Sequence, residues 1–157
     1  SVFMELKKKY RSVVYKRRLT LPYDWALDCL AGNCLWPETQ IGREIGYAMD
    51  FYPDLEPRVF LSYERDSWYA PESGLRITFD NAIHFRTADL TLDSDPWGTA
   101  LLRPDQVLME LKAPGTIPLW MVRLLTERKL YKTSFSKYGT AYQILLEQEY
   151  KGGKRYA

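Results

Sequence analysis

The stretch VFMELKKKYRSVVYKRRLT, residues 2–20, reads as two β-strands joined by a short turn. In its first half, Glu5 and Lys7 alternate with Met4 and Leu6. Side chains two residues apart in a strand point to the same face, so the charged pair would lie on one face and the apolar pair on the other. The stretch therefore predicts a hairpin with one charged face.

The same alternation continues through the later predicted strands, which cover 13–20, 58–69, 75–80 and 107–112. Apolar residues fall on the face opposite the charged ones, as expected for strands that cover a core on one side. Most of the charges are basic and lie in mid-strand, and the few acids fall in repeated Glu-x-Lys pairs. The basic positions are Lys7, Lys16, Arg18, Arg65, Arg76 and Lys112.

The other segments predict several helices and one more strand. Thr39 is suited to cap a helix, and Pro118 stands at the start of an apolar-periodic one. At 157 residues, the chain is long enough for a single domain of the α+β class, built mostly from antiparallel strands with covering helices. The predicted helices cover 23–31, 39–50, 119–127 and 135–146, and the additional strand covers 83–92.

Composition limits the function classes. The net charge is +2, from 22 basic and 20 acidic side chains, which does not indicate a nucleic-acid-binding protein. No apolar run is long enough to span a membrane and no signal peptide is recognisable, so a membrane domain or partner would belong to a longer parent protein. Cys29 and Cys34 do not make a disulfide framework, which favours a reducing, cytoplasmic setting.

The repeated charged face has two interpretations. It is either an ordinary solvated sheet face, or the lining of a tunnel formed when the strands close on one another. Half a dozen converging cations would be strongly destabilising without a compensating anion. A linear polyphosphate would compensate them with charge-assisted hydrogen bonds, and the few carboxylates could hold a divalent metal against its oxygens. Glu5 and Asp80 could be such metal ligands or internal counter-ions, and the pattern does not separate the two roles.

Six motifs follow one another along the chain: ELK at 5–7, YKRR at 15–18, SYER at 62–65, LRITFD at 75–80, MELK at 109–112 and FSKY at 135–138. In this order they resemble the VTC (vacuolar transporter chaperone) domain of the triphosphate tunnel metalloenzymes, also called the CYTH-like superfamily. The resemblance covers nearly the whole chain and implies one tunnel domain over 1–157, an antiparallel β-barrel with covering helices. It also implies a polyphosphate polymerase, which transfers the γ-phosphate of a nucleoside triphosphate to a polyphosphate chain with Mn²⁺ or Mg²⁺.

The resemblance also implies roles for individual residues. The six basic strand positions would bind phosphates, and Glu110, with Glu5 as a further candidate, would hold the metal. Tyr63, Ser136 and Lys137 would complete the phosphate site. The last two stand at the start of a predicted helix, whose N-terminus is itself a favourable seat for phosphate.

Two departures from the family pattern leave alternatives open. Family domains begin with further strands that add Lys and Arg to the tunnel, so this stretch is expected to lack its N-terminal strands. Hydrolases of the superfamily open with Glu-x-Glu-x-Lys, whereas this chain has Glu5, Lys7 and Lys9, which disfavours triphosphate hydrolysis. A second alternative is a non-catalytic module that binds polyphosphate or inositol polyphosphate.

Overall fold

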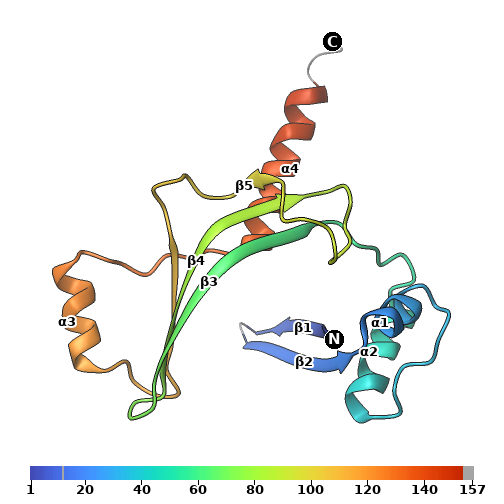
Figure 1. The fold of residues 1–157 in the computed structure, drawn as a ribbon, viewed down its shortest axis with the longest axis horizontal. Coiled ribbons are helices and arrows are strands. Elements are labelled where there is room, and N and C mark those ends of the chain that lie inside the picture. Colours follow the sequence, from blue (N-terminus) through green and yellow to red (C-terminus); the bar gives the residue numbers. More distant parts are fainter. Residues whose placement is uncertain (12, 154–157) are drawn as a thin grey trace. The chain divides into compact units, whose positions relative to one another are not determined.

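The computed structural model describes residues 1–11 and 13–153, and for 149–153 it describes the backbone alone (Figure 1). The chain divides into two compact units, Ser1–Glu56 and Pro57–Ala157. Both contain antiparallel strands and helices, which confirms the predicted α+β class. Neither sheet closes into a barrel among the residues described.

The first unit begins with the predicted hairpin. Strand β1 (Val2–Tyr10) pairs antiparallel with β2 (Val13–Leu21) along their full length. Glu5 lies opposite Arg18, and Lys7 lies opposite Lys16. Directly opposed residues share a face of the sheet, so the predicted charged face is present.

Two helices follow the hairpin. Helix α1 (Tyr23–Leu30) comes directly after Pro22, and α2 (Gln40–Phe51) is capped by Thr39, whose Oγ1 accepts a hydrogen bond of 3.0 Å from the Gly42 amide. Both helices follow the predicted bounds within a residue or two. Their buried side chains form the small core of this unit with the last residue of β2: Leu21, Ala26, Cys29, Ile45 and Ala48.

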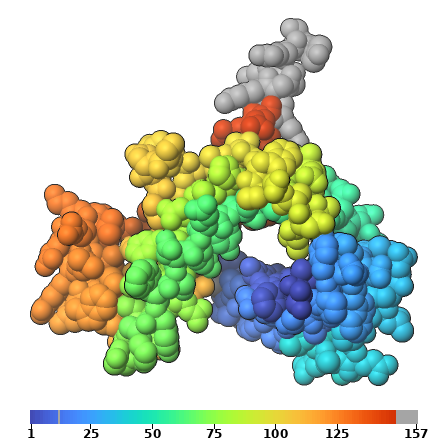
Figure 2. Space-filling view, in the orientation of Figure 1, coloured from blue at the N-terminus to red at the C-terminus, as the bar shows by residue number. Residues whose placement is uncertain are grey.

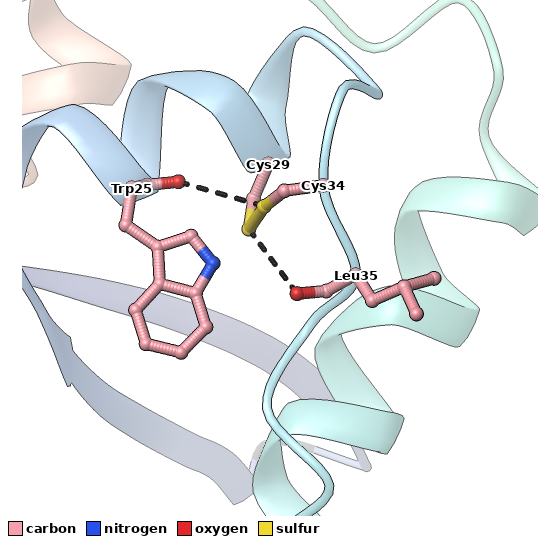
Figure 3. Close-up of a disulfide and its surroundings, with 4 residues drawn as sticks. All are labelled: Trp25, Cys29, Cys34 and Leu35. Atoms are coloured by element: carbon pink, nitrogen blue, oxygen red, sulfur yellow. Dashed lines mark hydrogen bonds between the residues drawn. A yellow bond between two sulfur atoms is a disulfide. The ribbon is translucent and has the colours of Figure 1, made fainter.

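Cys29 and Cys34 form a disulfide, with their Cα atoms 4.9 Å apart (Figure 3). The chain turns back after α1, where the Asn33 amide donates to the Asp28 carbonyl, and this turn brings Cys34 beside the helix. The two sulfurs lie 3.7–3.8 Å from the carbonyl oxygens of Leu35 and Trp25. The sequence did not predict this disulfide, which closes the end of α1 onto the segment leading to α2.

The second unit is built on one long hairpin. Strand β3 (Phe60–Ala70) pairs antiparallel with β4 (Leu75–Arg86). The far edge of β4 is shared by two shorter strands, β6 (Leu108–Lys112) along its first half and β5 (Thr99–Ala100) near its end. Helix α3 (Leu119–Glu127) matches its prediction, and α4 (Lys137–Gly153) starts later and runs further than predicted.

Strand β4 corrects the sequence interpretation. Two strands were expected, over 75–80 and 83–92, but a single strand continues to Arg86 with a bulge in its middle. Ser62 lies opposite His84 and Glu64 opposite Asn81, so β4 carries one extra residue there. Ala82 takes a φ of 46°, a left-handed conformation found at bulges and rare for residues with a Cβ.

After β4, the chain forms a loop that is held by hydrogen bonds to the buried Arg86. The Arg86 guanidinium donates to the carbonyl oxygens of Asp89, Asp95 and Trp97 at 2.8–3.1 Å, and to Ser94 Oγ. These partners are spread over the loop that joins β4 to β5. Arg86 therefore fixes this loop, and the strand predicted over 83–92 ends at Arg86 instead. No helix in the described part of the chain is long and apolar enough to cross a membrane.

Candidate anion-binding site

In the first unit, the charged face of the hairpin is arranged around one carboxylate. Glu5 receives the side chains of Arg18 at 2.5 Å, Lys16 at 2.7 Å and Lys7 at 3.4 Å. The register explains this arrangement, because Arg18 lies directly opposite Glu5 and the two lysines form the next pair on the same face of the hairpin. Three cations share one anion, and the cluster retains an excess of positive charge.

The ionisation of Glu5 reflects its neighbours. Partial burial raises the pKa of the carboxyl, but hydrogen bonds and charge attraction from Lys16 and Arg18 outweigh burial and lower its pKa to about 2. Glu5 is therefore ionised at neutral pH and acts as a counter-ion. The sequence left its role open between counter-ion and metal ligand, and in this structure its oxygens are occupied by basic side chains.

A second cluster lies in the second unit, around the buried Asp80 of β4. Arg65, opposite it on β3, donates to its two oxygens at 2.5 and 2.7 Å. Lys137, the first residue of α4, donates to the same carboxylate at 2.5 Å. Asp80 therefore connects the sheet to the beginning of the last helix.

The electrostatics of this cluster hold Asp80 and Arg65 charged. Burial acts to raise the pKa of Asp80, but the hydrogen bonds from Arg65 and Lys137 prevail and keep it below its usual range. The hydrogen bond to Asp80 likewise raises the pKa of Arg65. The ring of Tyr63 lies against both cations. Its centroid is 4.9 Å from the Arg65 guanidinium carbon and 4.5 Å from the Lys137 side-chain nitrogen.

Next to this cluster is a small cavity of about 90 Å³, formed by β3, β4 and β6 alone. Its lining follows from the register, because Ser67 and Glu110 lie on either side of Thr78, and Arg76 lies beside Lys112. Three cations and one carboxylate face the cavity, and the carboxylate pairs with Lys112 at 2.9 Å. The lining residues are Arg65, Ser67, Arg76, Thr78, Glu110 and Lys112.

A larger hollow of about 490 Å³ is lined by residues of β6, one of the three strands that form the small cavity. It lies between β6, α3 and the segment 130–137, and α3 forms the orange lobe beside the green hairpin in Figure 2. Its walls are mostly apolar, with Leu125, Leu130 and Phe135 among them. Because Glu110 lines both spaces, the two hollows meet at β6. Lys137 lines the larger hollow.

The structure brings most of the predicted site residues together within each unit. Lys7, Lys16 and Arg18 surround Glu5, while Arg65, Arg76, Lys112 and Glu110 line the small cavity, and Tyr63 and Lys137 join it through Arg65 and Asp80. Convergence of both sets on one tunnel stays a prediction.

Ser136 has a different position from the other predicted residues. Its Oγ accepts a hydrogen bond of 3.1 Å from the Gly139 amide, and its carbonyl accepts from Thr140. Ser136 therefore caps α4 in this structure and fixes where Lys137 begins the helix. Binding of phosphate by Ser136 stays a prediction.

A divalent metal at this site would require oxygen ligands from carboxylates or carbonyl groups. No group of three or more His, Cys, Asp or Glu residues that could hold a metal occurs in the described ranges. Mg²⁺ and similar ions are, however, often held by one or two carboxylates and completed by substrate phosphates and water. Glu110 fits that arrangement, since it is partly exposed at the cavity, whereas Glu5 is engaged by three cations.

Sequence reasoning missed two hydroxyl groups in the cavity lining, Ser67 and Thr78. The signal was present, because Ser67 stands two residues after Arg65, and Thr78 stands two after Arg76, on the same faces. The sequence also left Asp80 undecided, and the structure places it as the counter-ion of Arg65 and Lys137.

A scan against protein families matches the model described as VTC domain to residues 1–146. The comparisons with curated proteins and with solved structures found no match.

Proposed function

Because this chain belongs to the VTC domain family, we propose that it binds a chain of phosphates and serves polyphosphate synthesis. The activity proposed is transfer of the γ-phosphate of a nucleoside triphosphate to a growing polyphosphate chain, assisted by Mn²⁺ or Mg²⁺. Family membership points to a polyphosphate-related function, and the arrangement of cations supports the finer proposal.

The observation that carries the proposal is the small cavity on β3, β4 and β6. Arg65, Arg76 and Lys112 face it, and Glu110 is its sole carboxylate within the described residues. Arg65 already satisfies Asp80 and Lys112 already contacts Glu110, but Arg76 forms no ion pair with any residue whose position is described. A multivalent anion supplies the missing negative charge and accepts several hydrogen bonds at once.

The same residues fit phosphoryl transfer. A terminal phosphate is largely ionised at neutral pH, so alignment and charge neutralisation matter more than a strong base. The bond between the γ-phosphorus and the oxygen that bridges it to the β-phosphorus breaks, and this oxygen leaves with the nucleoside diphosphate. A new bond forms between the γ-phosphorus and a terminal oxygen of the polyphosphate. Arg65 and Arg76 would hold the transferred group and offset its charge. A divalent ion, when bound through Glu110, would neutralise further phosphate oxygens.

We further propose that the antiparallel strands belong to a tunnel barrel whose charged faces point inward. The support is the alternation within each unit. Glu5, Lys7, Lys16 and Arg18 share one face of the first hairpin. In the second unit, one face of the sheet carries Arg65, Arg76, Glu110 and Lys112. The hairpin of β1 and β2 would then add Lys7, Lys16 and Arg18 to the phosphate path.

Polymer synthesis tests the enzymatic part. The protein is incubated with ATP and Mn²⁺, and the product is measured with a polyphosphate stain. We expect polymer from wild type and a loss of at least tenfold for Arg76→Ala, whereas Arg123→Ala, an exposed change on α3, retains full activity. Equal polymer from both variants would remove the cavity from the mechanism, and no polymer from wild type would remove the synthetic activity.

A second function is favoured by one observation. Glu5 and Glu110, the carboxylates expected to hold metal, both lie in ion pairs with basic residues. This arrangement suits a module that binds phosphate chains without metal and without turnover. Binding of tripolyphosphate that is unchanged by EDTA, with no nucleotide consumed, would support that alternative.

A further inference from the structure

Thr78 is a buried polar residue with an unused hydroxyl. The residue lies in the first half of β4 and is only 6% exposed. Its Oγ1 has no hydrogen-bond partner within the part of the chain that the structure describes. Buried hydroxyls are normally paired, and an unpaired one costs free energy, so this group calls for a partner.

The position of Thr78 indicates what that partner is. Thr78 lies between Ser67 and Glu110 in the sheet and lines the small cavity that Arg65 and Arg76 also face. The surrounding charge is mainly positive, which favours an anion. The hydroxyl can donate one directional hydrogen bond to an anion oxygen, in addition to the charge-assisted hydrogen bonds that lysine and arginine donate.

The geometry points to Thr78 as a phosphate-binding residue, whose Oγ1–H donates to an oxygen of the phosphate chain held in this cavity. This inference rests on the proposed phosphate-binding function and names a residue that the family resemblance did not assign. A valine would fill the same volume on a β-strand without an unsatisfied hydroxyl. The threonine therefore has a role that packing does not supply.

Ser62 provides a matched comparison. Its Oγ is also buried without a hydrogen-bond partner in the described residues. It lies on β3 opposite His84, however, and does not line the small cavity. Replacing either hydroxyl removes an unpaired polar atom, but only Thr78 would lose a contact with the ligand.

The test is the affinity for tripolyphosphate, measured by calorimetry at fixed salt concentration, together with the melting temperature of the unliganded protein. Thr78→Val is expected to weaken binding about tenfold, because a hydrogen bond to a charged acceptor is lost. Its unliganded melting temperature should equal or exceed that of wild type. Thr78→Ser should stay within about threefold of wild type, since it keeps the hydroxyl, and Ser62→Ala should bind as wild type does.

The outcomes separate this inference from the function on which it rests. If wild type binds tripolyphosphate and Thr78→Val binds equally tightly, the hydroxyl meets only water and the inference is wrong. If wild type does not bind at all, the proposed function fails and this inference fails with it. Should Thr78→Val not fold, the pair Thr78→Ala and Thr78→Ser gives the same comparison, and equal affinities would overturn the assignment.

Discussion

Replacing Asp80 by asparagine removes one negative charge and keeps the size of the side chain. Asp80 is fully buried, and it holds Arg65 through two hydrogen bonds and Lys137 through one. In the variant, both cations lose their counter-ion while the sheet and α4 still hold them in place. The change therefore tests whether this carboxylate organises the cationic site.

The expected loss of stability follows from the burial of the carboxylate. Breaking a buried ion pair by removing one partner typically costs 3–5 kcal/mol. Arg65 is about one-third exposed and can recover some hydration, so the lower end, about 3 kcal/mol, is the better expectation. For a chain of this size, that loss corresponds to a fall in melting temperature of roughly 6–12 °C.

The assay is thermal unfolding of Asp80→Asn with and without tripolyphosphate. Phosphate oxygens can replace the lost carboxylate as acceptors for Arg65 and Lys137, so the ligand should stabilise the variant more than it stabilises wild type. Asp66→Asn is the control, because Asp66 is exposed and directly follows Arg65 in β3. A melting temperature within 1 °C of wild type, or equal ligand-induced shifts in both proteins, would refute this reasoning.

Two other predictions concern stability. The pKa of Glu5 is lowered to about 2 from the ordinary value of 4.5, so its ion pairs stabilise the fold above pH 4.5 and stop doing so as the pH falls toward 2. Because its partners are about half-exposed, urea unfolding should give a difference in unfolding free energy between wild type and Glu5→Gln of only about 1 kcal/mol at pH 6. This difference should disappear by pH 2, and a difference that stays constant with pH would contradict the prediction. Arg86→Lys should lower the unfolding free energy by about 3 kcal/mol, since an ammonium group cannot reach all the acceptors of the guanidinium. A melting curve by circular dichroism that matches wild type would show that the loop between β4 and β5 does not depend on Arg86.

Alternation was the part of the sequence that could be read reliably. It predicted that Glu5 shares a face with Lys7 and that Lys16 shares a face with Arg18, and the strand register places both pairs on one face of the hairpin. It could not show the bulge at Ala82, because a left-handed alanine has no signature in the sequence. The prediction therefore divided one strand into two.

The details of the site were less accessible for a physical reason. Alternation gives the face of a side chain but not which partner it reaches, so Asp80 stayed undecided until Arg65 and Lys137 were seen to share it. A hydroxyl such as that of Thr78 adds no charge to a pattern and was overlooked. The spacing of Cys29 and Cys34 alone does not determine whether the turn between them lets the sulfurs meet.

The most direct test of the central claim is the dependence of affinity on the number of linked phosphates. Orthophosphate, tripolyphosphate and a longer polyphosphate are titrated into wild type and into the double variant Arg76→Ala/Lys112→Ala at one ionic strength. If the cavity binds a chain of phosphates, affinity for wild type rises at least tenfold from orthophosphate to tripolyphosphate, and the double variant loses most of that rise. Equal affinity for all three anions, or an undiminished rise in the double variant, would contradict the account.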